Sequence, residues 1–254
     1  MAKSRIFTTS CITDKGAKNN EDSSFLVALD DIFIAAVADG VGGLSKGEVA
    51  SKYITKSIEK WCDDMEENMG SITFSDLEVE LKTLAYRIHE ELKAISEERK
   101  YTFGSTLTLA VIGKKKYRVI HVGDSRAYIL NGKELKKITE DMTVSEYENQ
   151  TGEKISNIPE SRKEHTLLEC MGVGEINPKS YSGQLEDDYD FLICSDGFSN
   201  NLKEWYLKKE LRKKQTIRTA LENIIIKMRS LGETDNITAV AIRRRTVESE
   251  VAGD

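Results

Sequence analysis

Short apolar runs, rich in β-branched and aromatic residues, recur along the chain and predict strands. Two of them meet at Asp30-Asp31, which predicts a hairpin, and Asn131-Gly132 is typical of another tight turn. The predicted strands cover residues 5–13, 24–29, 32–38, 105–112, 117–122, 126–130, 179–185, 189–195 and 236–243.

Between these runs, apolar residues recur every three or four positions and predict helices. Leu77, Leu81, Leu84 and Ile88 fall on one helical face, and Ser75 is the candidate N-cap in front of them. The same periodicity predicts three further helices, at residues 46–65, 201–213 and 216–231.

The order of these elements indicates the fold class. Helices and strands are segregated rather than alternating, which argues against a parallel, doubly wound sheet and predicts an α+β fold. We expect a central antiparallel β-sandwich flanked by helices on both outer faces. No repeat or linker divides the chain, so a single domain over residues 1–254 is expected. Residues 139–178 are irregular and polar, and so long a stretch in a compact domain usually has a function, such as a lid.

Composition and net charge limit the kinds of partner that the protein is expected to bind. Of the 254 residues, 39% are hydrophobic and 31% charged, as in soluble globular proteins. The net charge of −6 disfavours nucleic-acid binding, which needs a basic surface. The most apolar run, residues 32–41, is about half as long as a membrane-spanning helix. We therefore expect a cytoplasmic protein with neither nucleic acid nor membrane as partner.

Local charge and cysteine patterns change this picture little. The basic runs 114–116, 208–214 and 243–245 predict a hairpin turn, a solvated helix face and a strand end. The four cysteines contain no Cys-x-x-Cys pair, so they are expected to be small buried residues in a reducing compartment.

Aspartates stand where strands end or begin. Asp39 and Asp196 each follow an apolar run and precede a glycine, Asp124 follows Gly123 after a third run, and Asp235 stands just before the last strand. One such aspartate would indicate only a turn. Four of them predict strand ends that converge on one place. Carboxylates gathered there need a counter-charge, and oxygen ligands favour magnesium or manganese.

The sequence contains little that supports other catalytic mechanisms. The chain has three histidines, too few for a zinc site. His89 begins a zincin-like motif, but Lys93 replaces its second histidine, and we expect His89 to be exposed on a helix and His121 to be structural. No Gly-x-Ser-x-Gly elbow or cysteine phosphatase loop is present. Without a covalent nucleophile, a metal-activated water is the best candidate attacker.

Six motifs, in this order, resemble those of the protein phosphatase 2C (PPM) family of metal-dependent phosphatases. The resemblance extends over about residues 13–243. The motifs are Asn20-Glu21-Asp22, residues 37–43 (Val-Ala-Asp-Gly-Val-Gly-Gly), Phe103-Gly104-Ser105-Thr106, Gly123-Asp124-Ser125-Arg126, Ser195-Asp196-Gly197 and Thr234-Asp235-Asn236-Ile237-Thr238.

The resemblance implies a protein serine/threonine phosphatase with two Mn²⁺ or Mg²⁺ ions at one end of a β-sandwich. By this resemblance, Asp39 bridges the ions, the Gly40 carbonyl binds one, and Asp196 and Asp235 bind the other. Asp22 is expected to orient the attacking water. Asp124 is expected to bind a weaker third ion, and residues 139–178 correspond to the family's flap.

The chain departs from the family pattern at three positions. Ala17 occupies the place of the usual phosphate-binding arginine, so Lys18 is expected to substitute, although lysine lacks a bidentate fork. Val41 stands where eukaryotic members carry a histidine proposed as general acid, as in bacterial-type members. Asn200 replaces an aspartate of the third-metal position.

The resemblance also implies phosphoprotein substrates and a cognate serine/threonine kinase, and we expect a monomer. Two alternatives remain open at this point. One is a phosphatase with a narrow regulatory target, such as an anti-sigma-factor antagonist. The other is a catalytically inactive module of the same fold, although such modules typically lose metal-binding aspartates and this chain keeps Asp39, Asp196 and Asp235.

Overall fold

The computed structural model describes residues 3–16, 19–30, 32–41, 46–67 and 74–248. They form two five-stranded sheets, and every strand pairing is antiparallel. The first sheet has the order β1 (Lys3–Asp14), β10 (Ile237–Glu248), β9 (Tyr189–Cys194), β6 (Arg126–Asn131) and β7 (Glu134–Lys137). The second has the order β2 (Asp22–Leu29), β3 (Ile32–Asp39), β4 (Leu107–Ile112), β5 (Lys116–Val122) and β8 (Lys179–Gln184).

Strand β3 shows why the sheets stack. Phe33 and Val37 face the first sheet and pack in one core with Phe191 and Val240. The alternate residues Ile34, Ala36 and Ala38 face the opposite way, into a second core. Successive side chains of a strand point to opposite faces, so a strand buried on both faces reads as an unbroken apolar run.

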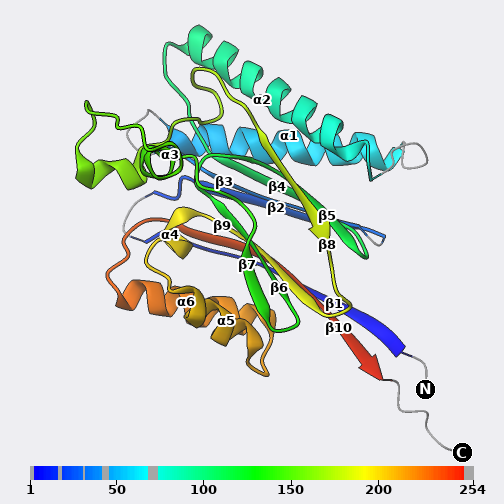
Figure 1. Ribbon diagram of the computed structural model, residues 1–254. Coiled ribbons are helices and arrows are strands. Elements are labelled where there is room, and N and C mark those ends of the chain that lie inside the picture. The colour runs from blue at the N-terminus through cyan, green and yellow to red at the C-terminus, as the bar shows by residue number, and fades with distance from the viewer. Residues whose placement is uncertain (1–2, 17–18, 31, 42–45, 68–73, 249–254) are drawn as a thin grey trace, which may run out of the picture.

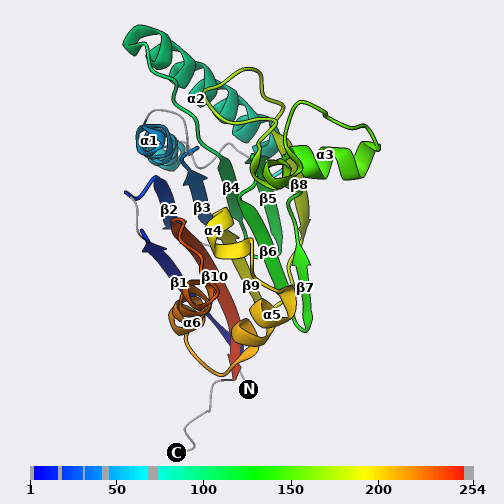
Figure 2. The same cartoon turned by 90° about the vertical axis from the view of Figure 1, so that its left-hand side faces the viewer.

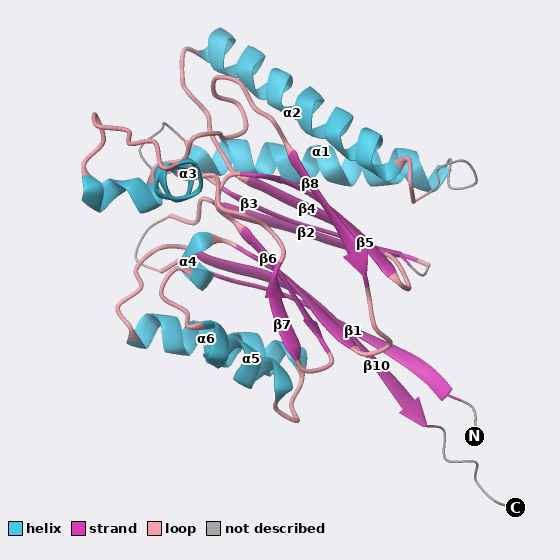
Figure 3. Cartoon of the chain, viewed as in Figure 1, coloured by secondary structure: helices cyan, strands magenta, loops and turns pink. Residues whose placement is uncertain are grey.

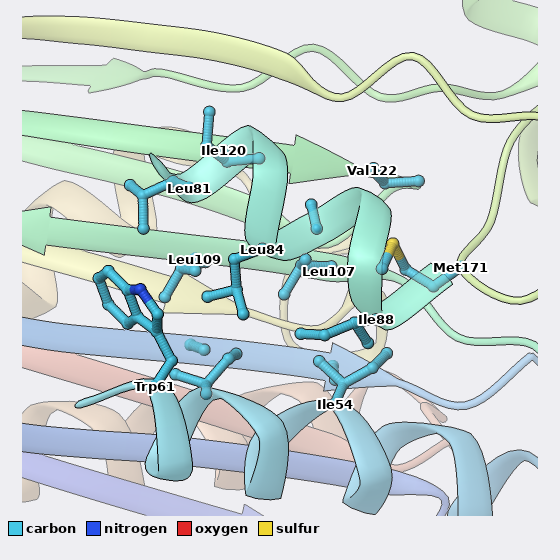
Figure 4. Packing of buried hydrophobic residues seen from close by; sticks show 14 of the residues in the cluster. Ile54, Trp61, Leu81, Leu84, Ile88, Leu107, Leu109, Ile120, Val122 and Met171 are labelled. Carbon is cyan, nitrogen blue, oxygen red and sulfur yellow. The ribbon is translucent and has the colours of Figure 1, made fainter. Parts of the chain in front are cut away.

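Helices cover the outer face of each sheet (Figures 1 and 3). Helices α1 (Gly47–Glu67) and α2 (Leu77–Arg99) pack on the second sheet, where Ile54, Leu84 and Leu109 share a core (Figure 4). Helices α5 (Glu204–Arg212) and α6 (Ile217–Ser230) pack on the first sheet. The α+β sandwich with helices on both outer faces is therefore confirmed.

Several local expectations are corrected. Helix α2 begins after Asp76 rather than after Ser75, and the Asp76 side chain makes no capping hydrogen bond. Strand β7 pairs with β6 beyond the Asn131-Gly132 turn, in a segment with only one partly buried apolar residue, Leu135. The arginine run 243–245 lies within β10, and Arg243 and Arg244 are buried. Arg243 binds Asp190 through two 2.8 Å hydrogen bonds, which compensates the buried charge.

The stretch 139–178, called the flap segment from here on, is less irregular than its sequence indicates. It contains helix α3 (Val144–Thr151) and the short 3-10 helix η1 (Glu160–His165). The Thr143 hydroxyl caps α3 by accepting a 3.3 Å hydrogen bond from the Glu146 amide. Figure 1 shows α3 at the same end of the sandwich as the short helix α4 (Asp196–Ser199). None of the described helices is both long enough and apolar enough to cross a membrane.

Candidate metal centre

The β2–β3 hairpin brings two of the aspartates together. Asp22 and Asp39 are Cα partners in the antiparallel ladder, so their side chains share one face of the second sheet. The neighbouring Thr106 fixes the backbone of Asp39. The Asp39 amide donates to Thr106 Oγ1 at 3.0 Å, and the Thr106 amide donates to the Asp39 carbonyl at 2.8 Å.

Gly40 follows in a place that admits no side chain. A Cβ there would lie 2.5 Å from the backbone carbon of Gly47, at the start of α1. The Gly40 amide donates to the Glu21 carbonyl at 3.1 Å, and Gly40 forms a β-bridge with Ser105. Close backbone packing therefore requires glycine directly after Asp39.

Asp196 and Asp235 lie near the ends of two adjacent strands of the first sheet, β9 and β10. Asp196 begins α4 directly after β9, and Asp235 stands two residues before β10, which pairs with β9. A Cβ on Gly197 would come within 2.2 Å of the Asn236 carbonyl oxygen, so glycine is needed for this approach. The two turns that carry Asp196 and Asp235 are thereby in contact.

Two polar contacts connect the sheets at this end. Ser195 donates to Asp22 Oδ2 at 2.9 Å, and its hydroxyl accepts from the Thr238 amide at 3.0 Å. Asn236 accepts from the Glu21 amide at 2.7 Å and donates to the Lys15 carbonyl at 2.7 Å. The turns that carry the aspartates of the two sheets are therefore hydrogen-bonded to each other, at the end of the sandwich where α4 lies (Figure 2).

The carboxylates strongly affect one another. Burial, followed by repulsion from Asp22, Asp196, Asp124 and Asp235, raises the pKa of Asp39 well above its usual range. By exposed area Asp39 is only half-buried, but the surrounding protein atoms and neighbouring charges disfavour its ionised form.

The neighbouring carboxyls are shifted in the same direction. Burial raises the pKa of Asp22 to about 6. Burial, with repulsion from Asp196, raises that of Asp124 to about 8. The pKa of Asp196 is also raised, first by burial and then by Asp235.

These residues fit a pair of hard divalent cations. The donors are oxygens, their mutual repulsion calls for positive charge, and Asp22 Oδ1 is buried without a hydrogen-bond partner among the described residues. Within those residues, no three carboxylate, imidazole or thiol groups already surround one point as a complete ligand set. The fit rests on the oxygen donors and on the repulsion between the carboxylates, which divalent cations would neutralise.

Asp124 lies beyond β5, next to Gly123, whose φ of +105° favours glycine. The same turn carries Arg126, which pairs with Asp141 through contacts of 2.6–3.1 Å and donates to the Ser199 carbonyl at 3.2 Å. Asn200 donates to Asp196 Oδ2 at 3.0 Å. Asn200 is therefore a hydrogen-bond partner of a candidate ligand.

A cleft of about 580 Å³ opens beside Asp196 and Asp235. Its opposite wall is formed by the flap segment, through residues of α3 and η1 that include Glu146 and His165. A substrate in this cleft would touch both the carboxylates and the flap segment.

The structure departs from the sequence expectations at one histidine. His89 is buried rather than exposed, and its ring accepts from the Gly172 amide at 3.0 Å. His121 is structural as expected: it is buried, and its ring contacts Thr108 and the Glu140 carbonyl. Lys18 lies outside the described residues.

Several residues that shape the site were missed by sequence reasoning. Thr106, Ser195 and Asn236 were noted only as parts of motifs, and the Arg126–Asp141 pair joins residues 15 positions apart. In the sequence, the position of several of these residues next to the aspartates and glycines was the one feature that could have indicated their role.

Comparisons with known proteins show which family the chain resembles. Residues 10–233 match the family model described as protein phosphatase 2C. The chain is 30% identical over 240 residues to the serine/threonine phosphatase stp of Listeria monocytogenes, covering 91% of this chain and 94% of that protein.

Solved structures share the fold. The serine/threonine phosphatase Stp1 of Staphylococcus aureus superposes with a TM-score of 0.80 at 23% identity, covering 96% of each chain. The catalytic domain of the phosphatase PstP, crystallised with two manganese ions, superposes with a TM-score of 0.76 at 24% identity, covering 96% of this chain and all of that one.

Proposed function

Because the chain belongs to the protein phosphatase 2C family, we propose that Asp39, Gly40, Asp196 and Asp235 hold the two cations of a metal-dependent protein serine/threonine phosphatase. The family supplies the reaction: hydrolysis of phosphoserine and phosphothreonine in phosphoproteins at a dinuclear Mn²⁺ or Mg²⁺ centre. The observation that carries the residue assignment is the convergence of carboxylates around Asp39, which raises its pKa.

Each carboxylate has a separate role in this proposal. Asp39, at the centre of the cluster, would hold both ions, with the Gly40 carbonyl on one and Asp196 and Asp235 on the other. When bound, the ions lower the pKa of water and polarise the phosphoryl oxygens. They also neutralise the repulsion that keeps these carboxyls partly protonated, so the ligands can ionise together.

Asp22 orients the attacking water in this proposal. Ser195 holds its Oδ2 at 2.9 Å, and Oδ1 has no partner among the described residues. With a pKa raised to about 6, Asp22 is ionised at neutral pH and can accept a hydrogen bond from water there. Attack then proceeds directly on phosphorus, without a phosphoenzyme.

Two further assignments rest on the sequence. Lys18 is proposed to bind the substrate phosphate in place of the usual arginine, and Asp124 to bind a weaker third ion. An unchanged Michaelis constant for a phosphopeptide in Lys18→Ala would refute the first assignment.

The cellular setting is also proposed. A cognate serine/threonine kinase, a cytoplasmic location and a monomeric state fit a signalling phosphatase of this kind. A narrow regulatory target is the alternative to general phosphoprotein turnover.

Hydrolysis of para-nitrophenyl phosphate tests the function directly. We expect turnover that depends on Mn²⁺, is abolished by a chelator and returns when excess Mn²⁺ is added. A folded protein without manganese-dependent turnover would instead be an inactive module of the same fold.

A further inference from the structure

Two buried histidines contact the two ends of the flap segment. His121, on β5, contacts the Glu140 carbonyl at the N-terminal end. His89, on α2, contacts Gly172 and Gly174 at the C-terminal end. Neither ring belongs to the candidate metal centre.

The contacts of His89 define its protonation. The Gly172 amide donates to Nδ1 at 3.0 Å, so Nδ1 carries no proton. Nε2, 3.2 Å from the Gly174 carbonyl, must then be the protonated nitrogen and the donor. Burial lowers the pKa of His89, which keeps the ring neutral, as this pair of contacts requires.

The segment that His89 holds fits closely against the core. Gly172 has a φ of +83°, and a Cβ there would come within 2.6 Å of the Phe103 carbonyl. Met171, beside it, is fully buried in the core under α2 (Figure 4). Only a glycine backbone can reach the His89 ring at this place.

His121 provides the corresponding contact at the other end. Its Nε2 lies 3.1 Å from the Glu140 carbonyl, and its Nδ1 lies 2.9 Å from Thr108 Oγ1. Burial lowers the pKa of this ring to about 4, so it too is neutral at physiological pH. The adjacent Met142 amide donates to the Gly123 carbonyl at 2.8 Å, which adds a backbone contact at this end.

Backbone pairing connects the C-terminal end of the flap segment, which His89 contacts, to the candidate metal centre. Met171 and Ser105 exchange amide–carbonyl hydrogen bonds of 3.2 and 2.8 Å, and Ser105 forms the next bridge with Gly40. The C-terminal end of the flap segment therefore lies beside the backbone that carries Gly40. Flap-segment residues between Asp141 and His165 line the cleft together with Asp196 and Asp235.

We propose that His89 is a positioning residue: with His121 at the opposite end, it fixes the flap segment as the wall of the substrate cleft. The proposal rests on the phosphatase function proposed above. A phosphopeptide is long enough to contact both this wall and the candidate metal centre. A small aryl phosphate contacts the metal centre without depending on the wall. Loss of the His89 contacts should therefore weaken phosphopeptide binding more than small-substrate turnover.

Three variants test the proposal. His89→Phe keeps an aromatic ring but leaves the Gly172 amide and the Gly174 carbonyl unpaired. His89→Gln restores one donor and one acceptor without a titratable ring. Tyr86→Phe, on the exposed side of the same helix, is the matched control.

Amide hydrogen exchange, followed by mass spectrometry, is measured first because it does not depend on activity. We expect peptides from residues 141–178 to exchange about tenfold faster in His89→Phe, since an unpaired buried group is costly, while strands β9 and β10 keep their protection. His89→Gln and Tyr86→Phe should match the wild type. Uniformly faster exchange across the sheets would mean a general loss of stability and would overturn the positioning role.

Kinetics provide the second measurement. With Mn²⁺, His89→Phe should raise the Michaelis constant for a phosphothreonine peptide about tenfold with little change in kcat, and leave kcat/KM for para-nitrophenyl phosphate nearly unchanged. Equal losses for both substrates would contradict the proposal. A wild-type protein with no manganese-dependent turnover would refute the phosphatase function instead, while the exchange result would still decide whether His89 holds the flap segment.

Discussion

Asp22 and Asp39 stand directly opposite each other on the β2–β3 ladder, a placement that brings two like charges onto one face of a sheet. Like charges in this position destabilise a strand pair. Burial raises both pKa values, with added repulsion from Asp22 on Asp39 and from Asp196 on Asp22, so the site contains unfavourable charge interactions that a cation would relieve. The placement of these two aspartates therefore favours cation binding at the expense of the folding stability of the metal-free hairpin.

Replacing Asp39 should separate function from stability. Asp39→Asn keeps the shape but removes the central charge, so we expect kcat for para-nitrophenyl phosphate with Mn²⁺ to fall by more than about 100-fold. In chelator, the same variant should melt at a higher temperature than the wild type, because the repulsion is gone.

Asp235→Asn should lose turnover similarly, because it removes a second proposed ligand. Asp63→Asn, at an exposed position on α1, serves as the control and should behave as wild type in both assays. Wild-type rates in either Asp39→Asn or Asp235→Asn would mean that the ligands are misassigned.

Metal binding should depend on pH with a definite sign. Cations bind ionised carboxylates, so a site whose Asp22 has a pKa of about 6 and whose Asp124 has one of about 8 must release protons as it fills. We expect Mn²⁺ affinity to rise from pH 6 to pH 8. Isothermal titration calorimetry in buffers of different ionisation enthalpy should report net proton release.

The metal-free protein should show the opposite trend in stability. A folded-state pKa raised above the unfolded value of about 4 means that the folded state binds more protons between these two values. The free energy of unfolding should then fall as the pH rises through 6 and 8. A metal-free protein that became more stable over this range would contradict the raised pKa values.

The fold was largely predictable because its core elements are strongly patterned. Strand β3 is buried on both faces and reads as an unbroken apolar run, and α2 shows a clear helical stripe. Strand β7 and helix α3 have no such pattern: their stability comes from pairing with β6 and from the Thr143 cap, which composition does not reveal. The start of α2 was misjudged by one residue because Ser75 and Asp76 are both plausible N-caps.

The aspartates proposed to bind metal could be selected from the sequence because each stands beside a strand end and three lie next to glycine. The environment of His89 was not predictable. Its place on the helix follows from periodicity, but its burial depends on the flap segment folding back over α2 from more than 80 residues away. The same holds for Arg126 and Asp141, which meet only after the β6–β7 hairpin forms.

Gly197 should be essential for bringing the two halves of the site together. In Gly197→Ala, the new Cβ would lie 2.2 Å from the Asn236 carbonyl, so the turn carrying Asp235 must move away from Asp196. We expect Mn²⁺ affinity, measured by calorimetry, to fall at least about tenfold, since one ligand is displaced. Gly113→Ala is the control, because there the nearest atom is the end of the Phe74 side chain at 3.3 Å. Equal affinities in the two variants would show that the approach of Gly197 to Asn236 does not set the site.

Asn200 should determine whether a third ion binds. Its amide donates to Asp196 Oδ2 at 3.0 Å and so stabilises the ionised form of that carboxylate, but a neutral amide is a weak ligand for a hard cation. Asn200→Asp replaces the amide donor with a carboxylate close to Asp196. The pKa of Asp196 should then rise further, and the metal-free protein should become less stable. With Mn²⁺ present, the added carboxylate should act together with Asp124, and native mass spectrometry should detect a higher occupancy of the third ion than in the wild type. Asn201→Asp, one residue further along the same cleft, controls for added negative charge. If both variants bind as many ions as the wild type, Asn200 does not occupy a metal-binding position.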